Sequence, residues 1–308
     1  GKIKGMAEWR DEMSKAGKTD YTKPISGVTA VDDHTLRIQL VKAYPQLLYV
    51  LTMIPASVVP HEAVEFYGPE FQNHPVGSGP YKFKSWVRNS KVILVTNPTY
   101  RVETYPTKGE AGDQEKGFLA DAGKQLPLND GVTFTEIIED QPRWLNFRKG
   151  ELDLSEIPKD NFDSAVKNDA LIPEMSAQGV ILTKWIDPDT TFNAINMEDP
   201  VLGGVKGKLI RQAMALAVDT PELIKKFYNN RAIPAEGPVP PTLTDYDPKL
   251  KNPYKGSNIE KAKALLKKAG YPNGEGLPEI VYETYSGSTS RQIVEFFQQC
   301  MAQIGIKI

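Results

Sequence analysis

Side chains that could bind a metal ion or act as a base are few and widely spaced in this sequence. The three histidines, His34, His61 and His74, stand at unrelated spacings. Residues 61–65 read His-Glu-Ala-Val-Glu and lack the second histidine that the zinc-binding helix of a metalloprotease requires. The sequence therefore predicts no metal site.

Two short patterns resemble catalytic or phosphate-binding motifs, but each is incomplete. Ser164 and Lys167 fit the S-x-x-K pattern of penicillin-recognising enzymes, yet neither S-D-N nor K-T-G follows. Residues 203–208 are rich in glycine, but the spacing to Lys208 is wrong for a phosphate loop, and Leu209 replaces the serine or threonine that such a loop needs. We expect Ser164 to lie on a helix surface and residues 203–208 to form a loop that caps the next helix.

The remaining reactive groups also favour structural roles. Cys300 is the only cysteine, and the apolar residues around it recur with helical spacing, which predicts a buried thiol and not a nucleophile. The carboxylate pairs at positions 32–33 and 139–140 fall in turns or at strand ends, where solvated or capping roles dominate. A hydrolase needs a nucleophile and a base within reach of each other, and no such pair is evident. We therefore expect no catalytic residues, no cofactor and no enzymatic activity.

The composition indicates an ordinary globular protein. The chain has 308 residues, which suggests about two domains, and 40% of them are apolar. The formal charge of −2 and the lack of a dense lysine and arginine run argue against a nucleic-acid partner. The longest apolar run, residues 47–54, is far shorter than the roughly 20 residues that cross a bilayer.

Alternating apolar residues predict the strands that must position any site. Leu36, Ile38 and Leu40 alternate with polar residues and indicate a half-buried strand. Further elements are expected as follows: a helix over 61–67, strands over 92–95 and 132–138, a helix over 143–149, and a strand over 180–185. Residues 101–130, rich in glycine and charged side chains, are expected to form a surface excursion.

The clearest helix signals lie in the last third of the chain. Residues 209–218 carry the apolar stripe of a helix. Asp219 marks the end of this helix and is expected to cap the start of the next one. Ser257 and Glu260 have the spacing of a capping box, and Gly270 marks the end of the helix that follows. These patterns predict a packed helical layer.

Three blocks of sequence resemble one protein family. Residues 74–83 read His-Pro-Val-Gly-Ser-Gly-Pro-Tyr-Lys-Phe, and Trp86 and residues 97–101, Asn-Pro-Thr-Tyr-Arg, follow. A second block runs from Asn196 to Tyr228, and a third ends in Ala-Gly-Tyr at residues 269–271. In this order they are similar to the motifs of the family 5 extracellular solute-binding proteins, which feed dipeptide, oligopeptide and nickel ABC transporters.

This resemblance implies an α/β fold of the periplasmic-binding-protein-like type II class, bilobal with an extra small lobe, and truncated here at both ends. The expected parts are the remainder of the small lobe over 1–77, part of the first large lobe over 78–187, and the N-terminal part of the second large lobe over 188–308.

The same resemblance implies the substrate-binding component of an ABC importer. It would capture dipeptides or oligopeptides between two lobes and deliver them to a permease in the inner membrane. The protein is expected to be a monomer in the periplasm, or lipid-anchored outside a Gram-positive cell. A non-peptide ligand, such as an oligosaccharide, an opine or a metal chelate, is the alternative within that role, and a peptide hydrolase is the least favoured reading.

Alignment with the family motifs also suggests ligand-binding residues. Residues 191–196 are expected to form the strand that enters the last lobe, with Thr191 as a candidate and Phe192 and Asn193 as the main candidates; an ordinary role in the sheet is the alternative. Glu156 and Ile157 match a segment that faces the cleft in peptide binders, and Met53 of the small lobe is a further candidate.

Overall fold

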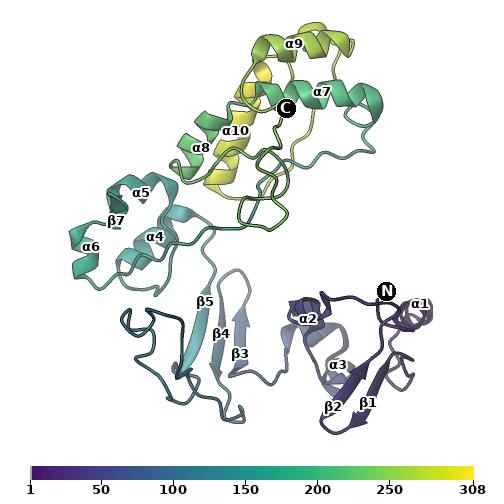
Figure 1. Cartoon of the computed structure of the whole chain (residues 1–308), viewed down its shortest axis with the longest axis vertical. Coiled ribbons are helices and arrows are strands. Elements are labelled where there is room, and N and C mark those ends of the chain that lie inside the picture. The colour runs from purple at the N-terminus through teal and green to yellow at the C-terminus, as the bar shows by residue number, and fades with distance from the viewer. Residues whose placement is uncertain (1) are drawn as a thin grey trace. The chain divides into compact units, whose positions relative to one another are not determined.

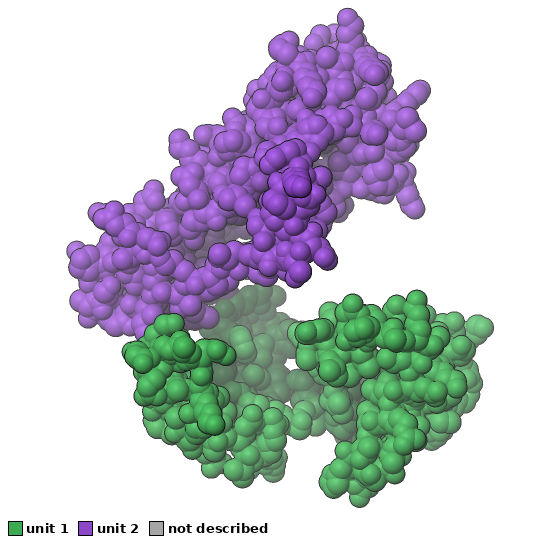
Figure 2. Space-filling model, viewed as in Figure 1, with its two compact units in different colours: residues 1–136 green, residues 137–308 purple. Residues whose placement is uncertain are grey.

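The computed structural model describes residues 2–308, which form two compact units that meet between Glu136 and Ile137 in sequence (Figure 2). The expected lobe boundaries at residues 77 and 187 stay predictions, since a division into two units does not test three lobes. Each unit is described by itself.

The first unit contains two antiparallel sheets (Figure 1). A hairpin pairs β1 (Val28–Asp32) with β2 (Thr35–Ile38), and a three-stranded sheet has the order β3 (Tyr81–Val87), β4 (Lys91–Thr96), β5 (Gly131–Thr135). Its helices are α1 (Met6–Ala16), α2 (Leu47–Leu51), η1 (Ile54–Ala56), α3 (His61–Tyr67) and η2 (Gly68–Asn73). The strands expected near residues 36, 92 and 132 and the helix over 61–67 are confirmed. The predicted alternation is confirmed for Ile38 and Leu40, which are partly buried, and is wrong for Leu36, which is 63% exposed.

The motif around residues 74–100 has a structural explanation in this sheet. The backbone N–H of Asn97 donates to the carbonyl of Pro80 at 2.9 Å, and its side-chain amide donates to the carbonyl of Gly79, also at 2.9 Å. Oδ1 of Asn97 accepts hydrogen bonds from the backbone and the hydroxyl of Thr99. Asn97 therefore joins the end of β4 to the turn before β3.

Residues 101–130 form an ordered excursion. Thr104 and Gln125 form an isolated antiparallel bridge, and the hydroxyl of Tyr105 donates to the carbonyl of Phe118 at 2.8 Å. Most of these residues are exposed, which confirms the expected surface position.

The second unit holds two apolar clusters. The first contains Trp144, Ala165, Val166 and Met175, contributed by α4 (Asp140–Arg148), α5 (Lys159–Ala165), β6 (Val166–Lys167) and α6 (Pro173–Ala177), while β7 (Ala170–Leu171) pairs with β6. Ser164 is exposed on α5, as predicted.

The larger cluster is formed mainly by α7 (Gly204–Ala217), α8 (Thr220–Tyr228), α9 (Ile259–Lys268) and α10 (Ser288–Ala302), with η3 (Pro272–Gly274) after α9. Its most buried side chains include Ile210, Leu266, Cys300, Met301 and Ile304.

Three local predictions for this unit are wrong. Residues 180–185 and 191–196 are not strands, because within residues 2–308 neither segment pairs with a strand. Val180 and Leu182 nevertheless pack against the Trp144 cluster. The glycine-rich residues 204–208 lie inside α7 and not in a loop before it.

The ends of α8 and α9 lie where the sequence predicts them, but one capping residue differs from the prediction. Asp219 caps α8 by accepting from the backbone N–H of Glu222 at 3.1 Å, as expected. The cap of α9 is Asn258 and not Ser257, since Asn258 Oδ1 accepts from the backbone N–H of Lys261 at 2.9 Å. Gly270, with a φ of +96°, follows the end of α9 as predicted.

Candidate ligand-binding site

A hollow of about 440 Å³ lies in the second unit between two irregular segments. We call it the Phe192 hollow. It is lined by Pro188, Asp189, Thr190, Thr191, Phe192, Ala235, Gly237, Pro238, Pro240, Leu243 and Asn252. Its volume falls within the range of small-molecule sites, which are concave and mostly apolar with a few polar groups. Two residues predicted from sequence, Thr191 and Phe192, therefore belong to one concave surface.

The backbone of the first segment is open to a ligand. In the part of the chain that the structure describes, the backbone N–H and C=O groups of residues 191–195 form no hydrogen bond with another residue. Thr191 and Phe192 are exposed, and Phe192 retains 76% of its accessible surface. Extended backbone with free donors and acceptors can pair with a second extended chain.

Glu236 holds the second segment in place. Its carboxylate accepts from the backbone N–H of Asn252 at 2.9 Å and forms an ion pair with Lys255, while Lys251 lies 3.9 Å away. These contacts, first the Asn252 hydrogen bond and then that of Lys255, lower the pKa of Glu236. The side chain is only 16% exposed and is not part of the lining of the Phe192 hollow. It therefore fixes Asn252 against the Ala235 to Pro238 wall. No short motif marks Glu236, and sequence analysis did not identify it.

Asn193 has a different environment from its two neighbours. Its Oδ1 accepts a hydrogen bond from the hydroxyl of Tyr282 at 2.7 Å, and the ring of Tyr282 stacks on Phe297 of α10 with 5.9 Å between ring centroids. Asn193 is not part of the hollow lining. Its side-chain oxygen is thus occupied by a structural contact.

The other predicted residues do not line the Phe192 hollow. Ile157 packs against the Trp144 cluster, and Glu156 is exposed, with its carbonyl accepting from the hydroxyl of Ser155 at 2.9 Å. Met53 lies in the first unit between α2 and η1 and is 58% exposed. Their ligand contacts remain predictions.

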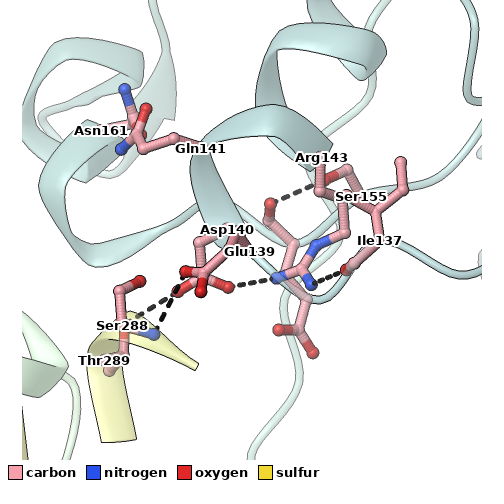
Figure 3. A network of polar contacts seen from close by, with 10 residues as sticks. Ile137, Glu139, Asp140, Gln141, Arg143, Ser155, Asn161, Ser288 and Thr289 are labelled. Atoms are coloured by element: carbon pink, nitrogen blue, oxygen red, sulfur yellow. Dashed lines mark hydrogen bonds and ion pairs between the residues drawn. The ribbon is translucent and has the colours of Figure 1, made fainter. Parts of the chain in front are cut away.

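The carboxylates of Glu139 and Asp140 bind the N-terminus of α10 (Figure 3). Glu139 accepts from the backbone N–H of Ser288 at 3.2 Å, and Asp140 accepts from the hydroxyl of Thr289 at 2.8 Å while it pairs with Arg143 at 2.6 Å. Hydrogen bonding from Ser288, followed by that from Arg291, lowers the pKa of Glu139. Of the two roles that the sequence left open, solvated or capping, these contacts favour capping, and the capped helix begins 149 residues later in sequence.

The first unit contains a smaller hollow of about 290 Å³ lined by Asn73, His74, Phe83, Trp86 and Arg88. The guanidinium of Arg88 lies 3.4 Å from the centroid of the Trp86 ring and also bonds to Asn73.

Among residues 2–308, no three histidine, cysteine, aspartate or glutamate side chains converge as a metal site would require. Within the same range, every helix is too short or too polar to cross a bilayer.

Two similar curated proteins are glutathione-binding proteins. The chain is 30% identical over 288 residues to the glutathione-binding protein GsiB of Pectobacterium atrosepticum, covering 93% of this chain and 48% of that protein. It is 28% identical over 298 residues to GsiB of Escherichia coli O6:K15:H31, covering 96% of this chain and 51% of the relative. The chain thus spans about half the length of the curated relatives that it matches.

Solved structures give the same fold. A periplasmic oligopeptide-binding protein of Borrelia burgdorferi superposes with a TM-score of 0.70 at 25% identity, covering 99% of this chain and 53% of that structure. DppA of Helicobacter pylori, in complex with the peptide STSA, gives a TM-score of 0.69 at 22% identity, with 98% and 55% coverage. The chain has the mixed helix and strand fold of type II periplasmic binding proteins, as the motifs predicted. The sequence model of one protein family, the bacterial extracellular solute-binding proteins, family 5 Middle, matches residues 6–308, and the chain belongs to this family.

Proposed function

We propose that this chain is part of the substrate-binding component of an ABC importer, and that it contributes backbone and side-chain contacts to a bound dipeptide or oligopeptide. Family membership and the names of the similar proteins, which bind glutathione or oligopeptides, support this role. The corresponding location is the periplasm, or the outer face of a Gram-positive membrane through a lipid anchor. The transport partner is a membrane permease, and the binding protein acts as a monomer.

The observation that carries the peptide proposal is the unpaired backbone of residues 191–195 beside the Phe192 hollow. A peptide in extended conformation supplies the complementary donors and acceptors, and its side chains enter neighbouring hollows. Backbone pairing gives affinity for many sequences, which suits an importer of mixed peptides.

Such a protein works by a shift between open and closed conformations. A ligand that contacts two lobes only in the closed form stabilises that form by the difference in its two affinities. The permease would then recognise the closed form. The three lobes proposed for this chain are residues 1–77, 78–187 and 188–308, and limited proteolysis would test these boundaries.

A non-peptide solute is the second candidate ligand within the same role. Trp185 and Phe192 are 73% and 76% exposed, and such rings can stack on the flat face of a sugar-like molecule. Two similar structures hold opines, mannopinic acid and agropinic acid. An oligosaccharide or a metal chelate belongs to the same alternative.

Native mass spectrometry of the protein that carries this chain, purified without refolding, tests the proposal. Release of a series of short peptides would support it. Release of a single opine, sugar or chelate would retain the transport role and replace the ligand class. Incubation with mixed peptides serves as the control for hydrolysis, and turnover would contradict the proposed function.

A further inference from the structure

A bulge in β3 shapes the smaller hollow of the first unit. The register of β3 on β4 shifts after Phe83, so that Phe83 pairs with Leu94 and Trp86 pairs with Val92. Leu94 and Val92 are two residues apart on β4 and therefore share one face of the sheet. Phe83 and Trp86 share that face as well, although a spacing of three would separate them in a regular strand. Both rings consequently line the same hollow.

The guanidinium of Arg88 is held over this hollow, which we call the Arg88 hollow. It lies 3.4 Å from the centroid of the Trp86 ring and donates a hydrogen bond to Oδ1 of Asn73. The side-chain amide of Asn73 donates in turn to the carboxylate of Glu70 at 2.6 Å. Because a carboxylate only accepts, Glu70 binds the NH₂ group of Asn73 and leaves its oxygen for Arg88. The position of the guanidinium is thus set by a ring and by an amide whose orientation is itself fixed.

Most donors around the Arg88 hollow remain open. A guanidinium has five N–H donors. Within residues 2–308, one nitrogen of Arg88 has a hydrogen-bond partner, and no carboxylate lies within ion-pair distance of it. His74 lines the same hollow, with its ring stacked on Tyr67 at 4.3 Å between centroids, and supplies a further ring N–H. The planar fork of an arginine matches a carboxylate, so the hollow suits one carboxylate group.

The hairpin that carries this hollow has only positive charges. Residues 81–96 contain no aspartate or glutamate, whereas the whole chain has a formal charge of −2. The cations of this hairpin are Lys82, Lys84, Arg88 and Lys91. Glu136 lies close to it, since its backbone N–H donates to the carbonyl of Ser90 at 2.7 Å. Within residues 2–308, the carboxylate of Glu136 pairs with none of the four cations. The hairpin therefore attracts anionic partners.

The size of the Arg88 hollow favours a single side chain as its occupant. Its volume of about 290 Å³ lies below the roughly 300–1,000 Å³ of small-molecule sites. Arginine and tryptophan are also the side chains that contribute most at protein interfaces, and Trp86 is 41% exposed. We propose that the Arg88 hollow and the β3–β4 hairpin dock an acidic segment of a partner protein, with one glutamate or aspartate side chain bound by Arg88 and His74. This inference goes beyond solute binding and does not depend on the ligand class.

Fluorescence anisotropy on the full protein that carries this chain tests the inference. The probe is a dye-labelled acidic peptide, Gly-Glu-Asp-Glu-Gly, with both ends blocked. Its neutral counterpart, Gly-Gln-Asn-Gln-Gly, reports any binding at a solute site. Arg88→Gln removes the charge, and Arg88→Lys keeps the charge but loses both the fork and the flat group that stacks on Trp86. The matched control is Lys82→Gln, which removes an exposed cation of the same hairpin that does not line the hollow.

The acidic peptide is expected to bind more tightly than the neutral one. Arg88→Gln should weaken its binding about tenfold, the effect of one charge-assisted contact. Arg88→Lys should weaken it about fivefold, because a lysine does not replace a stacked arginine. Lys82→Gln should leave the affinity within about twofold of the unmodified protein, since an isolated surface charge contributes little. Circular dichroism of each variant confirms that it is folded.

Three outcomes would overturn the proposal. The first is equal binding of the acidic and neutral peptides. The second is a loss for Lys82→Gln as large as that for Arg88→Lys, because the hairpin would then act only through its total charge. The third is Arg88-dependent sedimentation with phosphatidylglycerol vesicles without binding of the acidic peptide, which would assign the surface to a membrane. The solute released in native mass spectrometry has no bearing on these results, so this inference and the proposed function fail separately.

Discussion

The hydroxyl of Tyr282 donates a 2.7 Å hydrogen bond to Oδ1 of Asn193, although 89 residues separate the two in sequence. Tyr282 also stacks on Phe297, which belongs to α10. This pair therefore connects the segment that follows the Phe192 hollow to α10, where the residue next to Phe297, Phe296, belongs to the largest apolar cluster of the second unit. Burial raises the pKa of Tyr282, so its hydroxyl stays protonated and remains a donor at neutral pH.

Loss of either partner should have the same small effect on stability. We expect Tyr282→Phe and Asn193→Ala each to lower the free energy of unfolding by about 0.5–1 kcal/mol, because the bond is exposed and water competes for it. The double variant should cost less than the sum of the two. Chemical denaturation of the three variants measures this coupling. Strictly additive effects would show that the bond contributes nothing in solution.

Glu139 is expected to make stability depend on acid pH. Its folded-state pKa is lowered, so its contribution is present above the unfolded carboxyl pKa and is lost as the pH falls through the lowered folded value. Glu139→Gln should therefore reduce the thermal midpoint at pH 7 and have a smaller effect at pH 3. Thermal unfolding monitored by circular dichroism across this range is the measurement.

The matched control for this change is Glu151→Gln, since Glu151 is exposed and forms no side-chain ion pair within residues 2–308. Its midpoint should follow the unmodified protein at every pH. A pH profile shared by both variants would contradict the role of Glu139 as the cap of α10.

The cap of α9 gives a direct comparison of two adjacent residues. Asn258→Ala should cost about 1 kcal/mol, because it removes the acceptor of the Lys261 N–H. Ser257→Ala should cost almost nothing, since Ser257 does not cap the helix. Urea denaturation of both variants provides the test, and a larger loss for Ser257→Ala would restore the capping box that the sequence suggested.

Leu266 is completely buried in α9 and packs in the largest cluster. Leu266→Ala should lower the free energy of unfolding by about 2–5 kcal/mol, through lost apolar burial and the cavity left behind. Leu154→Ala is the control, because Leu154 is 88% exposed and its truncation should cost less than about 0.5 kcal/mol. Similar losses for the two leucines in calorimetry would contradict this packing.

Local signals in the sequence were reliable where one short segment determines the result. Asp219 caps α8 and Gly270 follows α9 because the side chain or φ angle required lies within a few residues of the helix end. The family motifs likewise predicted the fold, and Asn97 shows why one of them is so specific: its amide and backbone close the turn before β3.

Non-local relationships could not be predicted in this way. A strand needs a partner, and residues 180–185 and 191–196 have the apolar content of strands without a ladder. The contacts of Glu139 with Ser288 depend on helix packing across 149 residues. The second wall of the Phe192 hollow depends equally on Glu236, whose partners Asn252 and Lys255 carry no recognisable spacing.

The burial of Cys300 offers a way to follow motion inside the second unit. It is the only cysteine of the chain, it is 3% exposed within the α7, α9 and α10 cluster, and burial raises the pKa of its thiol. A thiol reagent should therefore modify the folded protein only when the cluster opens. The labelling rate, measured with and without a bound solute, then reports how strongly a ligand holds these helices together.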